Sequence, residues 1–198
     1  MDISTDLIKE LRAKTGAGIL DCKKVLVETK GDIEQATKVL RERGMAKAEK
    51  KATRTAGEGL IYAYIHPPGK LGVLLEMNCE TDFVARNDEF KNLCKDVAMH
   101  IAAAAPQYVR REQIPGDVIE KEKEIYANRA RNEGKPDKII DKIVEGRLGK
   151  FYKDVCCLEQ PFVKDPDISV DDLIKQAIAK IGENIVLKRF ARFIVGGE

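Results

Sequence analysis

The chain has 198 residues, of which 43% are apolar and 34% are charged. That length allows one ordinary domain or two small ones, and the composition argues against the disordered, collagen-like and membrane-spanning classes. The 35 Lys and Arg residues nearly balance the 33 Asp and Glu residues, which gives a net charge of +2. A dedicated nucleic-acid binder typically has a strong basic excess. We therefore expect a protein that binds another protein and makes no direct contact with nucleic acid.

The N-terminus and the cysteines indicate the compartment. Residues 1–6 lack the basic start and apolar run of a secretory signal. No stretch approaches the roughly 18 apolar residues that are needed to cross a bilayer. The five cysteines are an odd number without CxxC spacing, which argues against a disulfide framework or a structural zinc site. We expect a cytoplasmic protein with no membrane contact and no bound metal.

The first quarter of the chain has the pattern of three short helices. The first helix has apolar residues along one face and is ended by the glycines of segment 15–18. The second helix runs to Gly31. The third begins after Asp32, which is a capping residue, and ends at Gly44. The pattern predicts a three-helix N-terminal module at residues 1–44.

Residues 45–57 predict a helical, charged connector, because several cations stand among alanines. These cations are Lys47, Lys50, Lys51 and Arg54. A solvated linker face is one interpretation of this segment. A contact with a phosphate or a protein partner is the other.

Residues 58–198 have the pattern of an α+β core domain. Strands at 60–65 and 71–79 flank a Pro-rich turn and predict a hairpin, and a third strand is predicted at 184–195. The predicted fold class is α+β, with three N-terminal helices and then a small three-stranded antiparallel sheet flanked by helices. Those helices are expected at 88–105, 116–133, 137–158 and 170–181, so that the core includes a helical segment at about 116–158.

Two of these helices have regular apolar stripes and recognisable ends. One stripe runs from Phe90 to Ile101, and Asn87 is a plausible cap in front of it. The other helix follows the cap Ser169 and ends at Gly182.

The chain lacks recognisable catalytic machinery. It has two serines, both at predicted helix starts, and two histidines, His66 and His100, for which we expect structural or surface roles. Neither GxSxG, HExxH nor a P-loop pattern is present. We therefore expect a non-enzymatic protein without a cofactor or a nucleotide site of its own.

One connection departs from the polar composition of ordinary loops. Between the second strand and the next helix, residues 81–86 place Phe83 and Val84 among polar side chains. Two interpretations stay open. Either Phe83 packs into the core beside the start of the next helix, or it protrudes as a recognition side chain.

This segment, TDFVARN at residues 81–87, resembles a signature of the bacterial elongation factor Ts family. Residues 11–24, with GDIE at 31–34, resemble the N-terminal signature of that family, and GENI at 182–185 resembles its C-terminal block. Because the motifs occur in the family's order, the chain is identified as a member. The resemblance implies a ubiquitin-associated-like N-terminal module and a guanine-nucleotide exchange factor for the translation GTPase elongation factor Tu.

The resemblance also implies how the chain contacts that GTPase. Phe83 is expected to enter an apolar pocket near the magnesium site of the GTPase, where it weakens the binding of GDP. Asp82 is expected to engage polar groups at the mouth of the pocket, while Thr81 and Val84 fix the loop.

The N-terminal module is expected to supply a second contact. Leu20 and Lys23 lie off the apolar stripe of the second helix and are the candidates, with Lys51 of the connector as a weaker one. Ile19 follows the double-glycine turn and also fits the core of the module. Both roles therefore stay open for Ile19.

The same resemblance bears on oligomerisation and on rival functions. Some short relatives carry a cysteine in the last strand where this chain has Ala191, so a covalent dimer is not expected, while a non-covalent homodimer stays open. An RNA- or ribosome-associated protein is the alternative function, and an enzyme is the other rival. The first rival would use the connector cations together with Lys188, Arg189 and Arg192.

Overall fold

The computed structural model describes residues 3–197. The chain divides into two compact units. The first unit takes the chain up to Tyr62 together with Glu76–Lys95 and Asp172–Leu187. The second unit takes Ala63–Leu75, Asp96–Asp171 and the chain from Lys188 onward.

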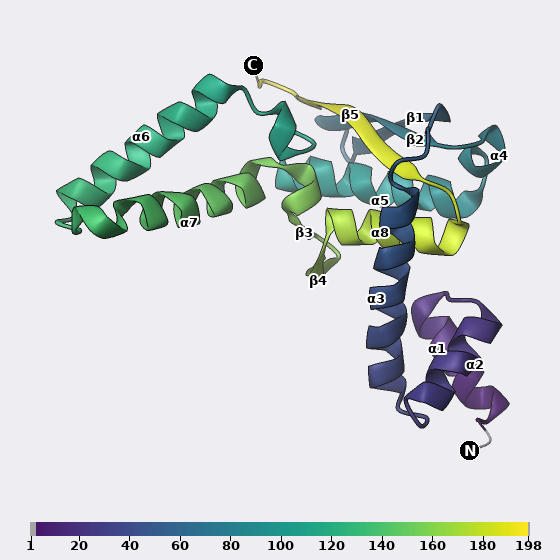
Figure 1. Cartoon of the computed structure of the whole chain (residues 1–198). Coiled ribbons are helices and arrows are strands. Elements are labelled where there is room, and N and C mark those ends of the chain that lie inside the picture. The colour runs from purple at the N-terminus through teal and green to yellow at the C-terminus, as the bar shows by residue number, and fades with distance from the viewer. Residues whose placement is uncertain (1–2, 198) are drawn as a thin grey trace. The chain divides into compact units, whose positions relative to one another are not determined.

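Three helices begin the first unit: α1 (Thr5–Thr15), α2 (Ile19–Glu28) and α3 (Ile33–Lys51) (Figure 1). The Ser4 side chain caps α1 by accepting a hydrogen bond from the Leu7 amide, and Asp32 caps α3 in the same way. The buried core of the three helices consists of Leu11, Cys22, Val25, Leu26, Ala36 and Leu40. The predicted N-terminal helices are therefore confirmed.

The predicted end of the third helix is wrong. Instead of stopping at Gly44, α3 continues to Lys51, so that the helix and most of the expected connector form one element (Figure 1). A Cβ atom at Gly44 would lie 3.2 Å from Cβ of Ala179 in α8 (Val170–Ile181). The glycine therefore permits close helix packing and does not cap the helix. The domain limits drawn at residues 44 and 57 stay a prediction.

A three-stranded antiparallel sheet follows, in the order β1-β2-β5. Its strands are β1 (Glu58–His66), β2 (Leu71–Cys79) and β5 (Ile185–Ile194), which confirms the hairpin and the distant third strand. Successive buried side chains on β2 and β5 are two residues apart, as one face of a strand requires. They are Val73, Leu75, Met77, Cys79, Ile185 and Leu187.

Helix α5 (Asp88–Ala104) has the predicted cap and the predicted buried face. The Oδ1 atom of Asn87 accepts a hydrogen bond from the Glu89 amide at 2.8 Å. The whole predicted stripe is buried, namely Phe90, Leu93, Cys94, Val97, Ala98 and Ile101. The helical periodicity therefore predicted both the element and its inward side.

In the second unit, helices α6 (Gly116–Asn132) and α7 (Asp137–Val155) lie side by side (Figure 1). Helix α7 ends before the predicted residue 158, and a 3₁₀ turn, η2 (Cys157–Glu159), follows it. Another short 3₁₀ turn, η1 (Arg111–Gln113), precedes α6. The antiparallel strands β3 (Pro161–Phe162) and β4 (Asp165–Ser169) were not predicted. Strand β3 is too short to show alternation, and β4 begins with Asp-Pro-Asp, which is typical of a turn.

Both histidines make hydrogen bonds within the chain. His100 is fully buried, and its Nε2 atom lies 2.9 Å from Oε1 of Gln160. Because that oxygen accepts, Nε2 carries the proton, and burial lowers the pKa of the ring. The Nδ1 atom of the exposed His66 lies 2.9 Å from the Tyr64 hydroxyl. The expected structural or surface roles fit these positions.

Candidate functional site

A single helical turn, α4 (Asp82–Ala85), occupies the segment that was predicted as a loop. Thr81 is its N-cap, and the Thr81 Oγ1 atom accepts a hydrogen bond from the Val84 amide at 3.3 Å. We refer to residues 81–86 as the Phe83 turn. The sequence does not reveal this helix, because four residues are too few to show helical periodicity.

Phe83 protrudes from this turn into solvent. Its exposed fraction is 85%, against 73% for Leu20 and 72% for Val195. Ala85 is buried and Val84 is half-buried, so these two residues supply the inward side of the turn. The interpretation that Phe83 packs into the core is therefore wrong, and an exposed aromatic ring of this size is a candidate binding residue.

Asp82 is already paired in the free chain. Its Oδ2 atom lies 2.7 Å from Nη2 of Arg86, one helical turn farther on. Both side chains are well exposed to solvent. An exposed ion pair contributes at most about 1 kcal/mol, so a partner can replace Arg86 at little cost.

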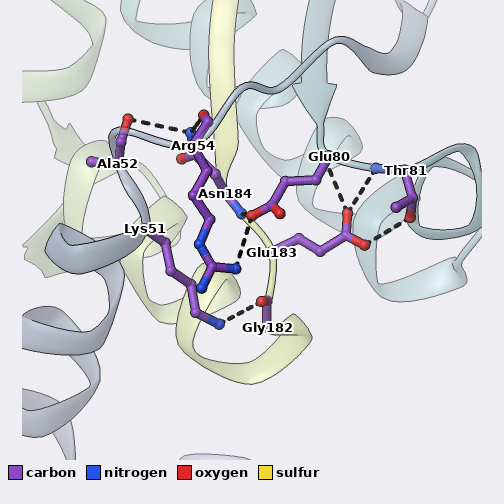
Figure 2. Close-up of polar contacts among 8 residues, drawn as sticks. All are labelled: Lys51, Ala52, Arg54, Glu80, Thr81, Gly182, Glu183 and Asn184. Carbon is purple, nitrogen blue, oxygen red and sulfur yellow. Dashed lines mark hydrogen bonds and ion pairs between the residues drawn. The ribbon is translucent and has the colours of Figure 1, made fainter.

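Glu80 and Thr81 are held by the carboxylate of Glu183, which is far away in the sequence but close in space (Figure 2). Its Oε2 atom accepts hydrogen bonds from the amides of Glu80 at 3.1 Å and Thr81 at 3.0 Å. Its Oε1 atom accepts the Thr81 hydroxyl proton at 2.7 Å. Hydrogen bonds to an ionised acceptor are stronger than neutral ones. Glu183 therefore fixes the backbone where the chain enters the Phe83 turn.

Glu80 makes the reciprocal contact with the segment that contains Glu183 (Figure 2). Its Oε1 atom accepts a hydrogen bond from the Asn184 amide at 2.6 Å. The same oxygen lies 3.6 Å from Nη1 of Arg54. Each of the two glutamates thus binds the backbone beside the other, which ties the end of β2 to the start of β5.

The segment Gly182–Asn184 also holds the end of α3 (Figure 2). The buried Asn184 side chain donates hydrogen bonds to the carbonyl oxygens of Arg54 at 2.8 Å and Ala52 at 3.4 Å. Lys51 donates a hydrogen bond to the Gly182 carbonyl. We call these eight residues the anchor network: Lys51, Ala52, Arg54, Glu80, Thr81, Gly182, Glu183 and Asn184.

A buried thiol adds one more contact to the Phe83 turn. Burial raises the pKa of Cys79 to about 11, and the nearby charge of Glu183 acts in the same direction. The thiol therefore stays protonated at neutral pH and donates to the Thr81 carbonyl at 3.1 Å. Thr81 is thus held through its amide, its hydroxyl and its carbonyl.

The second candidate contact lies on α2. Ile19 and Leu20 have exposed fractions of 55% and 73%, and Lys23 is also exposed. Val27, which the sequence analysis did not single out, is 51% exposed and lies two helical turns after Leu20. We call these four residues the α2 surface. The exposure of Ile19 shows that this side chain is not part of the module core.

Most of the cations in the expected connector have partners within the chain. Lys47 pairs with Asp21 at 3.0 Å and thereby lowers the pKa of that carboxyl. Lys51 and Arg54 belong to the anchor network. In β5, Arg192 donates a hydrogen bond to the Ala102 carbonyl at 3.2 Å. These contacts weaken the idea of a basic surface that binds RNA.

Residues 3–197 show no sign of a metal site, a disulfide or a membrane-spanning helix. Within residues 3–197, no group of three or more His, Cys, Asp or Glu side chains is placed to hold a metal. All five cysteines are buried free thiols. In the same range, the helices are too short or too polar for any of them to traverse a bilayer.

The structure thus brings some of the predicted site residues together and separates others. Thr81, Asp82, Phe83 and Val84 form one turn, and Ile19, Leu20 and Lys23 lie on one helix. Lys51 does not join the α2 surface but lies in the anchor network. Sequence reasoning missed the anchoring roles of Glu183 and Asn184, for which the only signal was their place in the GENI motif.

Comparisons with known proteins agree with these features. The family model described as elongation factor TS matches residues 21–177. Elongation factor Ts of Heliobacterium modesticaldum is 60% identical over 194 residues, which cover 98% of this chain and 90% of the relative. The proteins of that name from Geobacter sulfurreducens and Fervidobacterium nodosum are each 57% identical over 196 residues, 99% of this chain and 91% and 100% of the relatives. The chain belongs to the elongation factor Ts family.

Proposed function

We propose that Phe83 is the side chain by which this chain promotes the release of GDP from elongation factor Tu. A member of the elongation factor Ts family is a guanine-nucleotide exchange factor for that GTPase. It acts without enzymatic chemistry of its own, and as a translation factor it works in the cytoplasm. The observation that carries the proposal is the 85% exposure of Phe83 on an anchored turn.

The mechanism follows from how a GTPase holds its nucleotide. Backbone amides, a lysine and a magnesium ion compensate the charge of the phosphates. An exchange factor must bind the empty GTPase more tightly than the loaded one, and the nucleotide and the factor then weaken each other by the same coupling free energy. Phe83 enters an apolar pocket near the magnesium site that is open in the empty form and closed in the loaded form.

The size of the Phe83 side chain sets the scale of the effect. Burial of a Phe side chain contributes about 1.5–3 kcal/mol. At about 1.4 kcal/mol per tenfold change, that is enough to weaken GDP binding by roughly ten- to hundredfold. The protruding ring is free to deliver this energy, because little of it is already buried in its own chain.

The neighbours of Phe83 have supporting roles. Asp82 exchanges its exposed partner Arg86 for polar groups at the mouth of the pocket, which disturbs the network around the magnesium ion. Loss of the metal removes charge compensation from the phosphates and speeds the departure of GDP. Thr81 and Val84 keep the turn in shape through the hydrogen bond between them.

The α2 surface provides the second contact with elongation factor Tu. Its apolar side chains Ile19, Leu20 and Val27 are exposed on a helix whose opposite side is packed in the module core. Lys23 adds a cation to that surface. Lys51 supports binding indirectly, because its side chain holds the end of α3.

An equilibrium measurement tests the proposal. The affinity of elongation factor Tu for GDP is measured with and without saturating amounts of this protein, and the affinity for this protein is measured with and without GDP. The two ratios are expected to be equal, and Phe83→Ala is expected to reduce both by about tenfold or more. If a folded Phe83→Ala variant keeps the full coupling, the proposed role of Phe83 is wrong.

We further propose that the chain forms a non-covalent homodimer through exposed apolar side chains at the β1–β2 hairpin and the end of β5. In the second unit, Ile65, Leu74, Phe193 and Val195 are all exposed and line one shallow surface hollow. Contiguous exposed apolar surface of this kind is typical of an interaction site. A second copy would cover it, and Ala191 offers no thiol for a covalent link.

Sedimentation equilibrium tests the dimer. The wild-type chain is expected to show a monomer–dimer equilibrium, and Phe193→Lys is expected to shift it to monomer. Ile139→Lys, an equally drastic change of an exposed apolar residue on α7, serves as the control and should leave the equilibrium unchanged. A wild-type chain that is monomeric at all concentrations would contradict the proposal.

A further inference from the structure

We propose that Glu183 is a positioning residue for nucleotide exchange, because its carboxylate holds the Phe83 turn in the conformation that presents the ring. This inference rests on the proposed function of Phe83. It concerns a residue far along the chain that does not belong to the turn. Its support is the geometry of the anchor network (Figure 2).

Within residues 3–197, all three hydrogen bonds of the Glu183 side chain end on the two residues that lead into α4. Two of them take up the amides of Glu80 and Thr81. Neither amide can find a partner inside α4, because each precedes the helix. Glu183 therefore determines the direction in which the chain leaves β2 and enters the turn.

The third hydrogen bond controls the cap of the turn. The Thr81 hydroxyl has one proton, and it donates that proton to Glu183 at 2.7 Å. Its oxygen is then oriented to accept the Val84 amide at 3.3 Å. Without the carboxylate the hydroxyl can rotate, and the cap of a four-residue helix loses its orientation. Isolated helices of that length are not stable on their own.

The reciprocal contacts make the arrangement rigid. Glu80 accepts the Asn184 amide, and the Asn184 side chain holds two carbonyls at the end of α3. The turn that presents Phe83 and the helix that follows the α2 surface are thus attached to the same residues, Gly182–Asn184. A change at Glu183 is expected to loosen the Phe83 turn while Asn184 still holds α3.

The expected effect is on the maximum rate of GDP release. In Glu183→Ala the turn samples several conformations, so that only a fraction of bound complexes presents Phe83 correctly. The maximum rate should fall severalfold and no further than in Phe83→Ala. The half-saturating concentration should change little. Loss of folded protein would instead raise the apparent half-saturating concentration and leave the maximum rate unchanged.

Two further variants test whether the loss of the Glu183 hydrogen bonds causes the lower maximum rate. Glu183→Gln keeps the length of the side chain and one acceptor, which is neutral and therefore weaker than the carboxylate. Its maximum rate should lie between those of the wild type and Glu183→Ala. Glu133→Ala is the matched control, because the Glu133 carboxylate also takes part in several contacts, with Arg129 and Arg147. It should leave both kinetic parameters unchanged.

The decisive experiment is a double-mutant cycle on the rate of GDP release from elongation factor Tu at saturating factor. If Glu183 acts through Phe83, Glu183→Ala should lower the rate in the wild type and have no further effect in Phe83→Ala. An equal loss in both backgrounds would overturn the inference. If Phe83→Ala reduces the rate but Glu183→Ala does not, the inference fails while the proposed function stands. If Phe83→Ala itself has no effect, the proposed function fails.

Hydrogen exchange on the free protein gives an independent readout. The amides of Glu80 and Thr81 should exchange slowly in the wild type and much faster in Glu183→Ala, while the amides of the α1–α3 core keep their protection. Unchanged exchange at residues 80 and 81 would show that the carboxylate does not hold the turn, and would overturn the inference.

Discussion

The Phe83 turn and the α2 surface both present apolar side chains to solvent, but they are built in different ways. On α2, Leu20 and Lys23 are placed by the geometry of a regular helix, whose other side packs in a small local core. Phe83 is placed by a four-residue helix whose entry is fixed by Glu183, about a hundred residues later. The first region is specified by local sequence and the second by tertiary hydrogen bonds.

This difference suggests a division of labour. A flat helical surface adds binding energy in whichever nucleotide state the partner has, so it lowers the concentration needed for binding. A protruding ring on a fixed turn enters a pocket that exists in one state, so it changes the coupling with GDP. Variants in the two regions should therefore change these two quantities separately.

The largest effect is expected from the variant that combines Phe83→Ala with Leu20→Asp. Phe83→Ala is expected to lower the plateau rate and Leu20→Asp to raise the half-saturating concentration, each by the equivalent of about 1.5 kcal/mol or more. Because Phe83 lies in α4 and Leu20 in α2, two separate helices, the losses should add. The release rate at low factor concentration should therefore fall by about a hundredfold or more. A double variant no worse than either single variant would show that the regions act as one.

Leu20→Asp alone should have the next largest effect on GDP release. The Leu20 side chain is exposed in the free chain, and its burial against a partner contributes about 1.5–3 kcal/mol. The half-saturating concentration for GDP release should rise about tenfold or more, while the maximum rate stays close to that of the wild type. Lys30→Ala, at an exposed site after the end of α2, is the control. A lower maximum rate in Leu20→Asp would contradict the division of labour.

Lys23→Ala should have a smaller effect that depends on salt. Exposed charge pairs contribute about 0.2–1 kcal/mol, so the half-saturating concentration should rise by a factor of about five or less. Raising the ionic strength should reduce the difference from the wild type, because exposed charges are then screened. A difference that persists at high salt would assign Lys23 an apolar packing role.

His100 should affect the stability of the fold. It should not affect the contact of the Phe83 turn or of the α2 surface with elongation factor Tu. Burial lowers its pKa below the ordinary value of 6.5, so the unfolded chain takes up a proton that the folded chain does not. The free energy of unfolding should therefore be highest above that pH and fall as the pH is lowered through it. Thermal unfolding between about pH 7 and pH 5 should show a weaker pH dependence in His100→Asn than in the wild type. Equal pH dependences would contradict this assignment.

The elements with regular periodicity could be predicted from the sequence. The stripe from Phe90 to Ile101, the hairpin of β1 and β2, and the caps Asp32 and Asn87 all depend on residues that are close in the chain. The same local rules failed at Gly44, where a glycine that resembles a helix end allows the close approach of Ala179. Only the tertiary structure distinguishes these two uses of glycine.

The candidate site was harder to predict from the sequence than the periodic helices and strands. The spacing of residues 81–87 left Phe83 either buried or exposed, because the answer depends on which neighbours fill the inward side of the turn. Those neighbours are Val84 and Ala85. The anchoring by Glu183 could not be derived from local pattern at all, since an acidic residue before a strand is usually a solvated surface residue. The GENI motif marked the segment without indicating its role.

The most direct measurement is the release of a fluorescent GDP analogue from elongation factor Tu, followed by stopped flow over a range of concentrations of this protein. Phe83→Ala is expected to lower the plateau rate at least about tenfold with little change in the half-saturating concentration, while circular dichroism shows an intact fold. A folded variant that reaches the wild-type plateau would contradict the central claim that the exposed ring of Phe83 drives the release of GDP.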